Sequence, residues 1–290
     1  MTTRTVTRLA VIGAGTMGAQ IALQAALSGL ETSLTDAQPA QLDRARDTQA
    51  RLLTRRVERN QLSAEARDQA VARLRLTPEV AAAVDQADYV IEAVFEDLDA
   101  KRVVFQELDR LCSPEVVLAS NSSSIAISEI VTGLQHPERA VNMHFFHPVL
   151  VMKLVEVVQG PDSSAEAVAT AVEVARRMGK EPVVLTREIT GFIVNRVLNA
   201  LMREAMWLAE EGYATPEDID KAIKLGLNHP MGPFELADFS GLDITYNAWQ
   251  HTKQTAPGPS ERPPKILEEK VRAGHLGRKT GRGFYEYPGT

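Results

Sequence analysis

Residues 9–18 read LAVIGAGTMG, and this stretch decides the fold of the chain. A short apolar run enters a GxGxxG turn, and a segment rich in Ala and Leu with a helical pattern follows it. This order of strand, turn and helix is the context in which such glycines bind a dinucleotide. We expect Gly13 to permit the tight turn, Gly15 to let backbone N–H groups approach a pyrophosphate, and Gly18 to let the helix pack closely on the strand.

The identity of the dinucleotide depends on Asp36, which ends the next apolar run. A carboxylate at this place accepts hydrogen bonds from the adenosine ribose hydroxyls, and its charge repels a 2′-phosphate. Residues 37–39 include no Arg that could neutralise such a phosphate. The sequence therefore predicts NAD rather than NADP, with Thr16 and Met17 of the turn at the same site. The alternative for Asp36 is a carboxylate that only caps the turn.

Short runs rich in Val, Ile and Leu alternate with segments of helical period from Arg8 to about Thr186. The runs read LAVIG, TSLTD, YVIEAV, VVLAS, AVNMHF, KLVEVV and PVVL. Apolar strands separated by helices predict a doubly wound, Rossmann-type α/β domain over residues 1–187, with a parallel sheet covered on both faces. Residues 38–74 are too long for one crossover helix, and we expect them to form two antiparallel helices that project from the sheet.

The strand pattern stops after Thr186, and we expect residues 188–290 to form an all-α C-terminal domain. Residues 191–212 predict one long helix that is apolar around most of its circumference, which implies burial on several sides, against its own domain or another subunit. Residues 215–218, Thr-Pro-Glu-Asp, predict the start of a further helix. Thr can cap it, Pro can occupy its first turn, and acidic groups favour the positive end of its dipole.

The composition excludes several classes of function. A formal net charge of -6 disfavours a general nucleic-acid binder, which needs clustered Lys and Arg to neutralise phosphates. No stretch approaches the roughly 20 apolar residues that a membrane span requires. Cys112 is the only cysteine, so no intrachain disulfide can form, which fits a reducing compartment. We therefore expect a cytoplasmic protein without nucleic-acid or membrane partners.

Four further segments resemble the 3-hydroxyacyl-CoA dehydrogenase family. They are ASNSSSIAI (119–127), HFFHPVLVMKLVEVV (144–158), GFIVNR (191–196) and PMGPFELADFSGLD (230–243). The resemblance runs from Arg8 to the tail GRKTGRGFYEY, essentially the whole chain. It implies a reversible, NAD-dependent oxidation of a (3S)-3-hydroxyacyl-CoA to a 3-oxoacyl-CoA, and a homodimer joined through the helical domain.

Oxidation of a secondary alcohol needs a base that removes the hydroxyl proton while a hydride leaves for the nicotinamide, and imidazole suits this task. His144 ends an apolar strand, where α/β folds place their ligands. Glu156 lies inside the strand KLVEVV, so the two can pair only if the chain doubles back, with Pro148 at the reversal. The resemblance makes His144 and Glu156 the catalytic pair. The alternatives are a structural histidine and an exposed charge on an edge strand.

Two polar residues complete the expected active site. Ser123 follows the strand VVLAS and a polar turn, and the resemblance assigns it to bonding the substrate near the reacting carbon. Serines in such turns otherwise cap the next helix. The resemblance also assigns Asn195, at the start of the long helix, to polarising a substrate oxygen. The alternative is a polar stripe, shared with Asn199 and Arg203, that faces water.

The resemblance places further residues against NAD. Glu96 and Lys101, just beyond the strand YVIEAV, and Lys279 in GRKTG correspond to family positions that contact the cofactor, as does Ser123. Each charged residue could instead be surface charge. His147 stands where the family commonly has Asn, at the nicotinamide end of NAD. His144 and His147 have no carboxylate or cysteine at the usual spacing for a metal site, so we expect no metal.

Arg51, Arg55 and Arg59 recur every four residues on the helical excursion and so share one face of a helix. They could bind the phosphates of coenzyme A, as this excursion does in the family, or form a solvated face. Two other functions remain as alternatives for the whole chain. One is a dehydrogenase of a free hydroxy acid or sugar acid, and the other is a nucleotide-binding protein without turnover.

Overall fold

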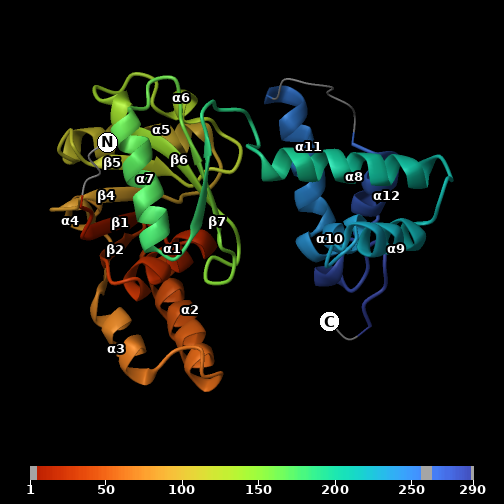
Figure 1. Ribbon diagram of the computed structural model, residues 1–290, viewed down its shortest axis with the longest axis horizontal. Coiled ribbons are helices and arrows are strands. Elements are labelled where there is room, and N and C mark those ends of the chain that lie inside the picture. The colour runs from red at the N-terminus through yellow and green to blue at the C-terminus, as the bar shows by residue number, and fades with distance from the viewer. Residues whose placement is uncertain (1–4, 256–262, 289–290) are drawn as a thin grey trace. The chain divides into compact units, whose positions relative to one another are not determined.

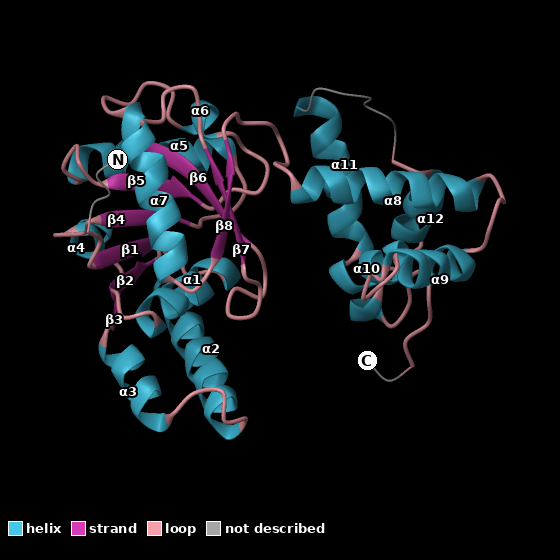
Figure 2. Ribbon diagram, viewed as in Figure 1, coloured by secondary structure: helices cyan, strands magenta, loops and turns pink. Residues whose placement is uncertain are grey.

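The structure is a computed structural model that describes residues 5–255 and 263–288. The chain divides into two compact units, Met1–Phe192 and Ile193–Thr290 (Figure 1). The first unit contains strands and helices, and the second contains helices (Figure 2). The boundary expected from the sequence, after residue 187, falls shortly before this division.

An eight-stranded sheet forms the centre of the N-terminal unit, with the strand order β3-β2-β1-β4-β5-β6-β7-β8. Its strands are β1 (Arg8–Ile12), β2 (Glu31–Thr35), β3 (Leu74–Thr77), β4 (Tyr89–Glu92), β5 (Val117–Ser120), β6 (Ala140–Phe145), β7 (Leu154–Val158) and β8 (Glu181–Leu185). The strand order reverses direction at β1, which pairs with β2 on one side and with β4 on the other. In open α/β sheets, such a switch point is where ligands bind. The Rossmann-type fold expected from the sequence is confirmed.

The helices of this unit cover both faces of the sheet. They are α1 (Thr16–Leu27), α2 (Pro39–Glu58), α3 (Ala64–Ala72), α4 (Val80–Val84), α5 (Leu98–Leu111), α6 (Ile127–Ile130), the short 3-10 turn η1 (Pro137–Arg139) and α7 (Ala165–Arg177). Alternate residues of β1 belong to two different cores: Leu9 and Val11 pack with α1 and α7, whereas Ala10 and Ile12 pack with α5 and α6. Because successive side chains of a strand point to opposite faces, a sheet covered on both faces needs unbroken apolar runs.

Two features of the sheet differ from the expectation. The sheet is not wholly parallel, because β7 runs antiparallel to β6. Only residues 146–153 connect these strands, and a parallel crossover needs a dozen or more residues. The sequence also gave no sign of β3, the edge strand LRLT between α3 and α4. An edge strand that is partly exposed carries no continuous apolar run, so its pattern was missed.

The C-terminal unit is all-α, as expected. Its elements are α8 (Val194–Glu210), α9 (Pro216–Leu227), α10 (Pro233–Ser240), α11 (Leu242–Thr255), α12 (Lys265–Arg272) and the 3-10 turn η2 (Arg278–Thr280). The predicted start of α9 is confirmed, since Thr215 accepts a hydrogen bond from the N–H of Asp218 at 3.2 Å and Pro216 opens the helix. The cap satisfies one of the N–H groups that a helix leaves unpaired at this end.

Within the single chain, α8 is not buried on several sides, and its burial against another subunit stays a prediction. Only Met202, Ala205 and Met206 of this helix are buried. Val197 is 64% exposed and Trp207 is 44% exposed, although both are large and apolar. One face of α8 therefore packs in the core of its unit, with Leu198 and Leu208 partly buried against that core, whereas Val197 and Trp207 lie on the surface of the chain.

A buried carboxylate attaches the C-terminal tail to the helices. Asp238 of α10 accepts hydrogen bonds from the N–H groups of Phe284 and Tyr285, both at 2.9 Å, and from the hydroxyl of Tyr287 at 3.1 Å. Asp238 is buried. Gly283 lies so close that a Cβ there would stand 2.0 Å from its Oδ1. The carboxylate thus serves as the common acceptor for a segment without regular structure.

Asp238→Ala should lower the free energy of unfolding of the C-terminal unit by about 3 kcal/mol, because it leaves buried donors without an acceptor. The two Trp residues, Trp207 and Trp249, both lie in this unit, so urea unfolding followed by Trp fluorescence reports on it. Arg272→Ala is the control: it removes an exposed ion pair with Glu268 and should change stability by less than about 0.5 kcal/mol. Equal effects of the two variants would contradict this role of Asp238.

Candidate active site

The glycine turn after β1 is built to leave room for a ligand. Gly13 has φ +102°, and a Cβ there would lie 2.7 Å from the carbonyl oxygen of Ala93. A Cβ on Gly18 would lie 1.8 Å from the carbonyl oxygen of Gly13, so the helix packs directly on the turn. A Cβ on Gly15 would meet nothing within 4 Å. Gly13 and Gly18 are thus required by packing, whereas Gly15 borders open space.

Open space at Gly15 coincides with the start of α1. Gly15 is the N-cap of this helix, and within the described residues no side chain caps it. The first N–H groups of a helix carry a partial positive charge and bind anions such as a pyrophosphate. Thr16 is exposed and Met17 is partly exposed in this first turn. The turn therefore fits a dinucleotide diphosphate.

Asp36 follows β2 and braces the glycine turn. Its Oδ2 accepts a hydrogen bond from the N–H of Ala14, and its Oδ1 accepts one from the N–H of Gln38, both at 2.8 Å. The carboxylate therefore caps the turn. Each carboxylate oxygen has a second lone pair, so the same group can still accept hydrogen bonds from ribose hydroxyls.

His144 and Glu156 lie directly opposite each other on β6 and β7. Residues paired in this way have Cβ atoms about 5 Å apart, which brings their side chains into contact. The Nδ1 of His144 lies 2.9 Å from the Oε2 of Glu156. His144 is 6% exposed and Glu156 is 1% exposed, so the pair is shielded from bulk water. The sequence predicted the chain reversal that this contact requires.

The contact with Glu156 determines which ring nitrogen of His144 carries the proton. A carboxylate can only accept a hydrogen bond, so Nδ1 of His144 is the donor, and the neutral ring carries its lone pair on Nε2. Phe146 and Phe192 contact the ring from the same unit, with ring centroids 4.4 and 5.7 Å away. His144 is therefore held in one orientation, with one nitrogen available to accept a proton.

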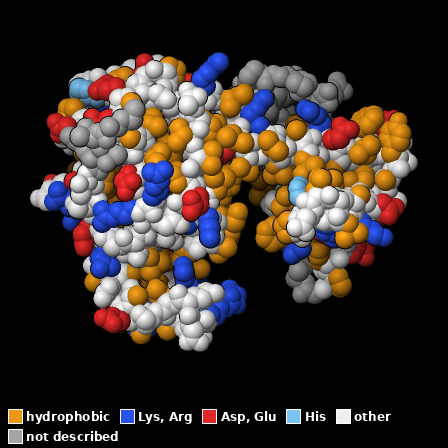
Figure 3. Space-filling view, viewed as in Figure 1, with side chains coloured by type: hydrophobic (Ala, Val, Ile, Leu, Met, Phe, Trp, Pro, Cys, Tyr) orange, Lys and Arg blue, Asp and Glu red, His pale blue; other side chains and the backbone are white. Residues whose placement is uncertain are grey.

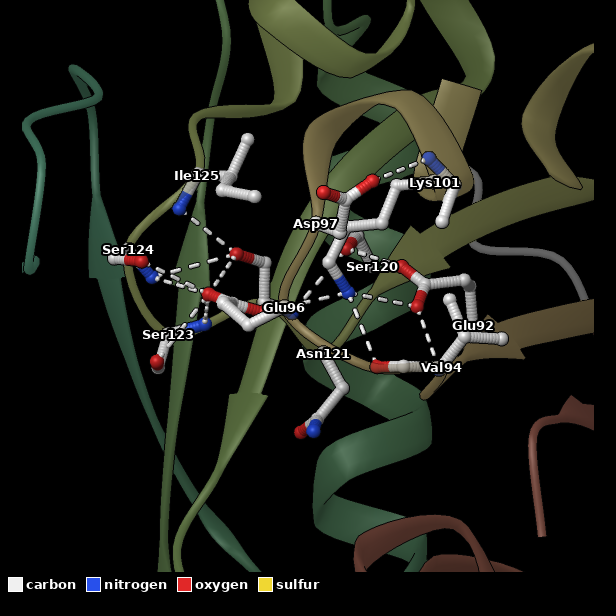
Figure 4. A network of polar contacts seen from close by, with 12 residues as sticks. Glu92, Val94, Glu96, Asp97, Lys101, Ser120, Asn121, Ser123, Ser124 and Ile125 are labelled. Atoms are coloured by element: carbon white, nitrogen blue, oxygen red, sulfur yellow. Dashed lines mark hydrogen bonds and ion pairs between the residues drawn. The ribbon is translucent and has the colours of Figure 1, made fainter. Parts of the chain in front are cut away.

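Ser123 lies in a turn that one carboxylate oxygen of Glu96 holds together (Figure 4). The Oε1 of Glu96 accepts hydrogen bonds from the hydroxyls of Ser122 and Ser124 at 2.6 and 2.9 Å. It also accepts from the N–H groups of Ser123 and Ser124 at 2.9 and 3.0 Å. Partial burial alone would raise the pKa of Glu96, but Lys101 and these donors outweigh it and lower that pKa below its usual range.

Lys101, expected to contact NAD, is 1% exposed. Its ammonium donates a hydrogen bond to Oε1 of Glu92 at 2.8 Å and lies 3.4 Å from Oε2 of Glu96. Glu92 is fully buried at the end of β4 and accepts further hydrogen bonds from the hydroxyl of Ser120 and the N–H of Val94. These contacts join the segment that follows β4 to the last residues of β4 and β5.

Asn121 is a contributor that the sequence did not single out. Its Oδ1 accepts a hydrogen bond from the N–H of Phe145 at 3.0 Å, next to His144 on β6. The segment that carries Ser123 is thereby tied to the strand that carries His144. The signal available in the sequence was a polar side chain at the end of a buried strand of a parallel sheet.

The remaining predicted residues lie on surfaces or in the C-terminal unit. Arg51, Arg55 and Arg59 are exposed along α2 and just beyond its end, and Figure 3 shows Lys and Arg side chains over the part of the N-terminal unit where α2 lies. His147 is exposed in the segment that follows β6. In the C-terminal unit, Asn195 is partly exposed in the first turn of α8, and the ammonium of Lys279 contacts Oδ1 of Asp243 at 2.6 Å.

The described residues contain neither a candidate metal site nor a candidate membrane span. No group of three or more His, Cys, Asp or Glu side chains in residues 5–255 and 263–288 could hold a metal ion. Over the same ranges, no helix has the length and apolar character that crossing a bilayer demands.

Residues 8–189 match the family described as 3-hydroxyacyl-CoA dehydrogenase, NAD binding domain, and residues 191–287 match its C-terminal domain. A probable 3-hydroxybutyryl-CoA dehydrogenase of Bacillus subtilis is 39% identical over 280 residues, which cover 97% of each chain. The 3-hydroxyadipyl-CoA dehydrogenase of Escherichia coli is 40% identical over 287 residues, covering 96% of this chain and 58% of the relative.

Among solved structures, the (S)-3-hydroxybutyryl-CoA dehydrogenase of Ralstonia eutropha has a TM-score of 0.92 and 36% identity to this chain. The match covers 98% of this chain and 99% of that one. Both halves of the chain, the Rossmann-type unit and the helical unit, are thus accounted for by one family. The chain belongs to the 3-hydroxyacyl-CoA dehydrogenase family.

Proposed function

We propose that the chain catalyses the reversible, NAD-dependent oxidation of (3S)-3-hydroxyacyl-CoA to 3-oxoacyl-CoA, with 3-hydroxybutyryl-CoA as a substrate. The observation that carries this proposal is the contact of His144 with Glu156 at the edge of the sheet where the glycine turn lies. Strands β1, β4, β5 and β6 are parallel, so the turn after β1 and the end of β6 share that edge. A base and a dinucleotide site therefore belong to one surface.

The proposed NAD site begins at the glycine turn. The N–H groups of Gly15, Thr16 and Met17 would receive the diphosphate, and Asp36 would accept hydrogen bonds from the adenosine ribose. His147 would lie toward the nicotinamide end, and Lys279 would contribute from the C-terminal unit. When bound, NAD accepts the hydride that leaves the carbon of the alcohol.

His144 is proposed to accept the proton of the substrate 3-hydroxyl on Nε2. Its Nδ1 keeps its proton, which is donated to Glu156. The imidazolium that forms therefore has a negatively charged partner, with Nδ1 2.9 Å from Oε2 of Glu156. Ser123 and Asn195 would donate hydrogen bonds to substrate oxygens and so orient the carbon toward the cofactor. In the reverse direction, the imidazolium returns the same proton to the carbonyl oxygen.

The proposed contact with coenzyme A lies on α2. Arg51, Arg55 and Arg59 are exposed, and three cations at this spacing form one face that suits phosphate groups. Arg51 donates a hydrogen bond to the hydroxyl of Thr48 at 3.0 Å, which leaves further guanidinium donors for a ligand.

We also propose a homodimer that forms through the C-terminal unit. Its support is a set of large apolar side chains exposed on that unit: Val197, Trp207, Tyr213, Leu225, Leu227, Phe239 and Ile244. Extensive apolar exposure marks surfaces that associate. A cytoplasmic location is proposed on the single cysteine, Cys112, which is a buried free thiol.

His144→Ala should lower kcat by about a thousandfold or more while NADH still binds, because a general base contributes on the order of 10²–10⁴ in rate. Glu156→Gln keeps the size of the side chain but removes the charge that stabilises the imidazolium, and it should lower kcat less than His144→Ala does. The absorbance of NADH formed from 3-hydroxybutyryl-CoA measures both. Near-normal turnover by His144→Ala would refute the mechanism.

The thioester should be preferred strongly over the free acid. The value of kcat/KM for (3S)-3-hydroxybutyryl-CoA should exceed that for free 3-hydroxybutyrate by about a hundredfold or more, because remote binding energy from coenzyme A orients the reacting carbon. Comparable values would favour a dehydrogenase of free hydroxy acids. Tight NAD binding without turnover of either compound would favour a nucleotide-binding protein that is not an enzyme.

Light scattering on the purified chain should give twice the monomer mass of 31.7 kDa. Burial of the exposed apolar side chains would drive this association. A monomer at micromolar concentration would contradict the proposed homodimer.

A further inference from the structure

Lys101 carries an ammonium that other groups of the chain enclose (Figure 4). It extends from the first turn of α5 and donates hydrogen bonds to Oε1 of Glu92 at 2.8 Å and to the carbonyl oxygen of Val94 at 3.4 Å. Oε2 of Glu96 lies 3.4 Å away. With 1% of the residue exposed, Lys101 presents almost no surface to a dissolved ligand.

The two oxygens of Glu96 face different partners. Oε2 faces Lys101, whereas Oε1 faces the serine turn, residues 122–124. All the contacts of Oε1 are donors, and such a site suits an ionised carboxylate. Glu96 follows β4 and the serine turn follows β5, so this one side chain connects two neighbouring loops at the edge of the sheet.

The charge of Glu96 depends on its surroundings. Its partial burial favours the neutral acid, and Lys101 is the nearest cation that opposes this effect and lowers the pKa. A carboxyl group with a lowered pKa stays ionised further into the acid range. Without Lys101, Glu96 would be a weaker acceptor for the donors of the serine turn.

We propose that Lys101 is a positioning residue: held by Glu92, it keeps the carboxylate of Glu96 in place to fix the serine turn and so aim Ser123. Lys101 acts on Ser123 through Glu96. The role of Ser123 in this inference rests on the proposed function. The claim that Lys101 and Glu96 hold the serine turn rests only on the contacts described above.

The serine turn is also linked to β6, the strand that carries His144. The hydroxyl of Ser122 accepts a hydrogen bond from the N–H of Ile125 at 2.8 Å, which closes the turn. Asn121, directly before it, accepts from the N–H of Phe145, beside His144. A displaced serine turn therefore changes the position of Ser123 relative to the base, and a misplacement of about 1 Å can cost on the order of a hundredfold in rate.

The test compares Lys101→Met with the double variant Lys101→Met/Glu92→Gln. Lys101→Met should lower kcat for 3-hydroxybutyryl-CoA at saturating NAD by about tenfold to a hundredfold and speed amide exchange at residues 123–125. Lys101→Met also leaves Glu92 buried without its cation, which lowers thermal stability. The double variant removes that carboxylate, so it should regain thermal stability but not kcat.

Asp109→Asn is the matched control. Asp109 lies near the other end of α5 and forms another buried ion pair, with Nη2 of Arg139 at 2.8 Å. Asp109→Asn should lower thermal stability while kcat and amide exchange at residues 123–125 stay as in the wild type. This outcome would show that loss of a buried ion pair does not by itself reduce kcat.

If the wild type is active, either of two results would overturn the proposal. If kcat of Lys101→Met at saturating NAD is normal, Lys101 does not position Ser123. If the double variant regains kcat together with stability, Lys101 only supports the fold. If the wild type turns over no 3-hydroxyacyl-CoA, the proposed function fails, and amide exchange still decides the inference: faster exchange in Lys101→Met supports it, and unchanged exchange overturns it.

Discussion

The antiparallel pairing of β6 with β7 is the constraint on which the candidate active site depends. Its register sets Glu156 opposite His144, so two residues that are 12 positions apart in the chain meet at 2.9 Å. A parallel β7 would start at the edge of the sheet opposite to the end of β6 and would therefore need a long crossover, and Glu156 would have no reason to match His144. The connection of residues 146–153 is too short for that crossover, so the local chain length determines the pairing.

The rest of the sheet places the glycine turn and the serine turn at the same edge as the pair of His144 and Glu156. The glycine turn follows β1 at the point where the strand order reverses, and the serine turn follows β5, beside β6. Parallel strands bring these turns to one edge, and carboxylates then hold them: Asp36 braces the glycine turn, and Glu96 braces the serine turn. The groups proposed to act on substrate and cofactor are therefore fixed by buried or partly buried acidic side chains before any ligand binds.

Much of this arrangement could be predicted from the sequence. Unbroken apolar runs revealed the strands. The spacing of Gly13, Gly15 and Gly18 revealed the turn, because a side chain at Gly13 or Gly18 would collide with neighbouring backbone atoms. The pattern could not reveal β3, whose edge position removes the need for apolar residues, or the exposed face of α8, whose apolar residues read as buried. It also could not show that Lys101 is enclosed, because the sequence gives a charge without its neighbours.

The central claim is that Glu156 holds His144 with its proton on Nδ1 and its lone pair on Nε2. Nitrogen-15 NMR of the histidine side chains, assigned to His144 by comparison with His144→Ala, tests this most directly. The account predicts that Nδ1 of His144 carries a proton in a hydrogen bond to Glu156, and that this hydrogen bond is lost in Glu156→Leu, which removes the acceptor. A neutral ring protonated on Nε2, or an Nδ1 proton that is unaffected by Glu156→Leu, would contradict it.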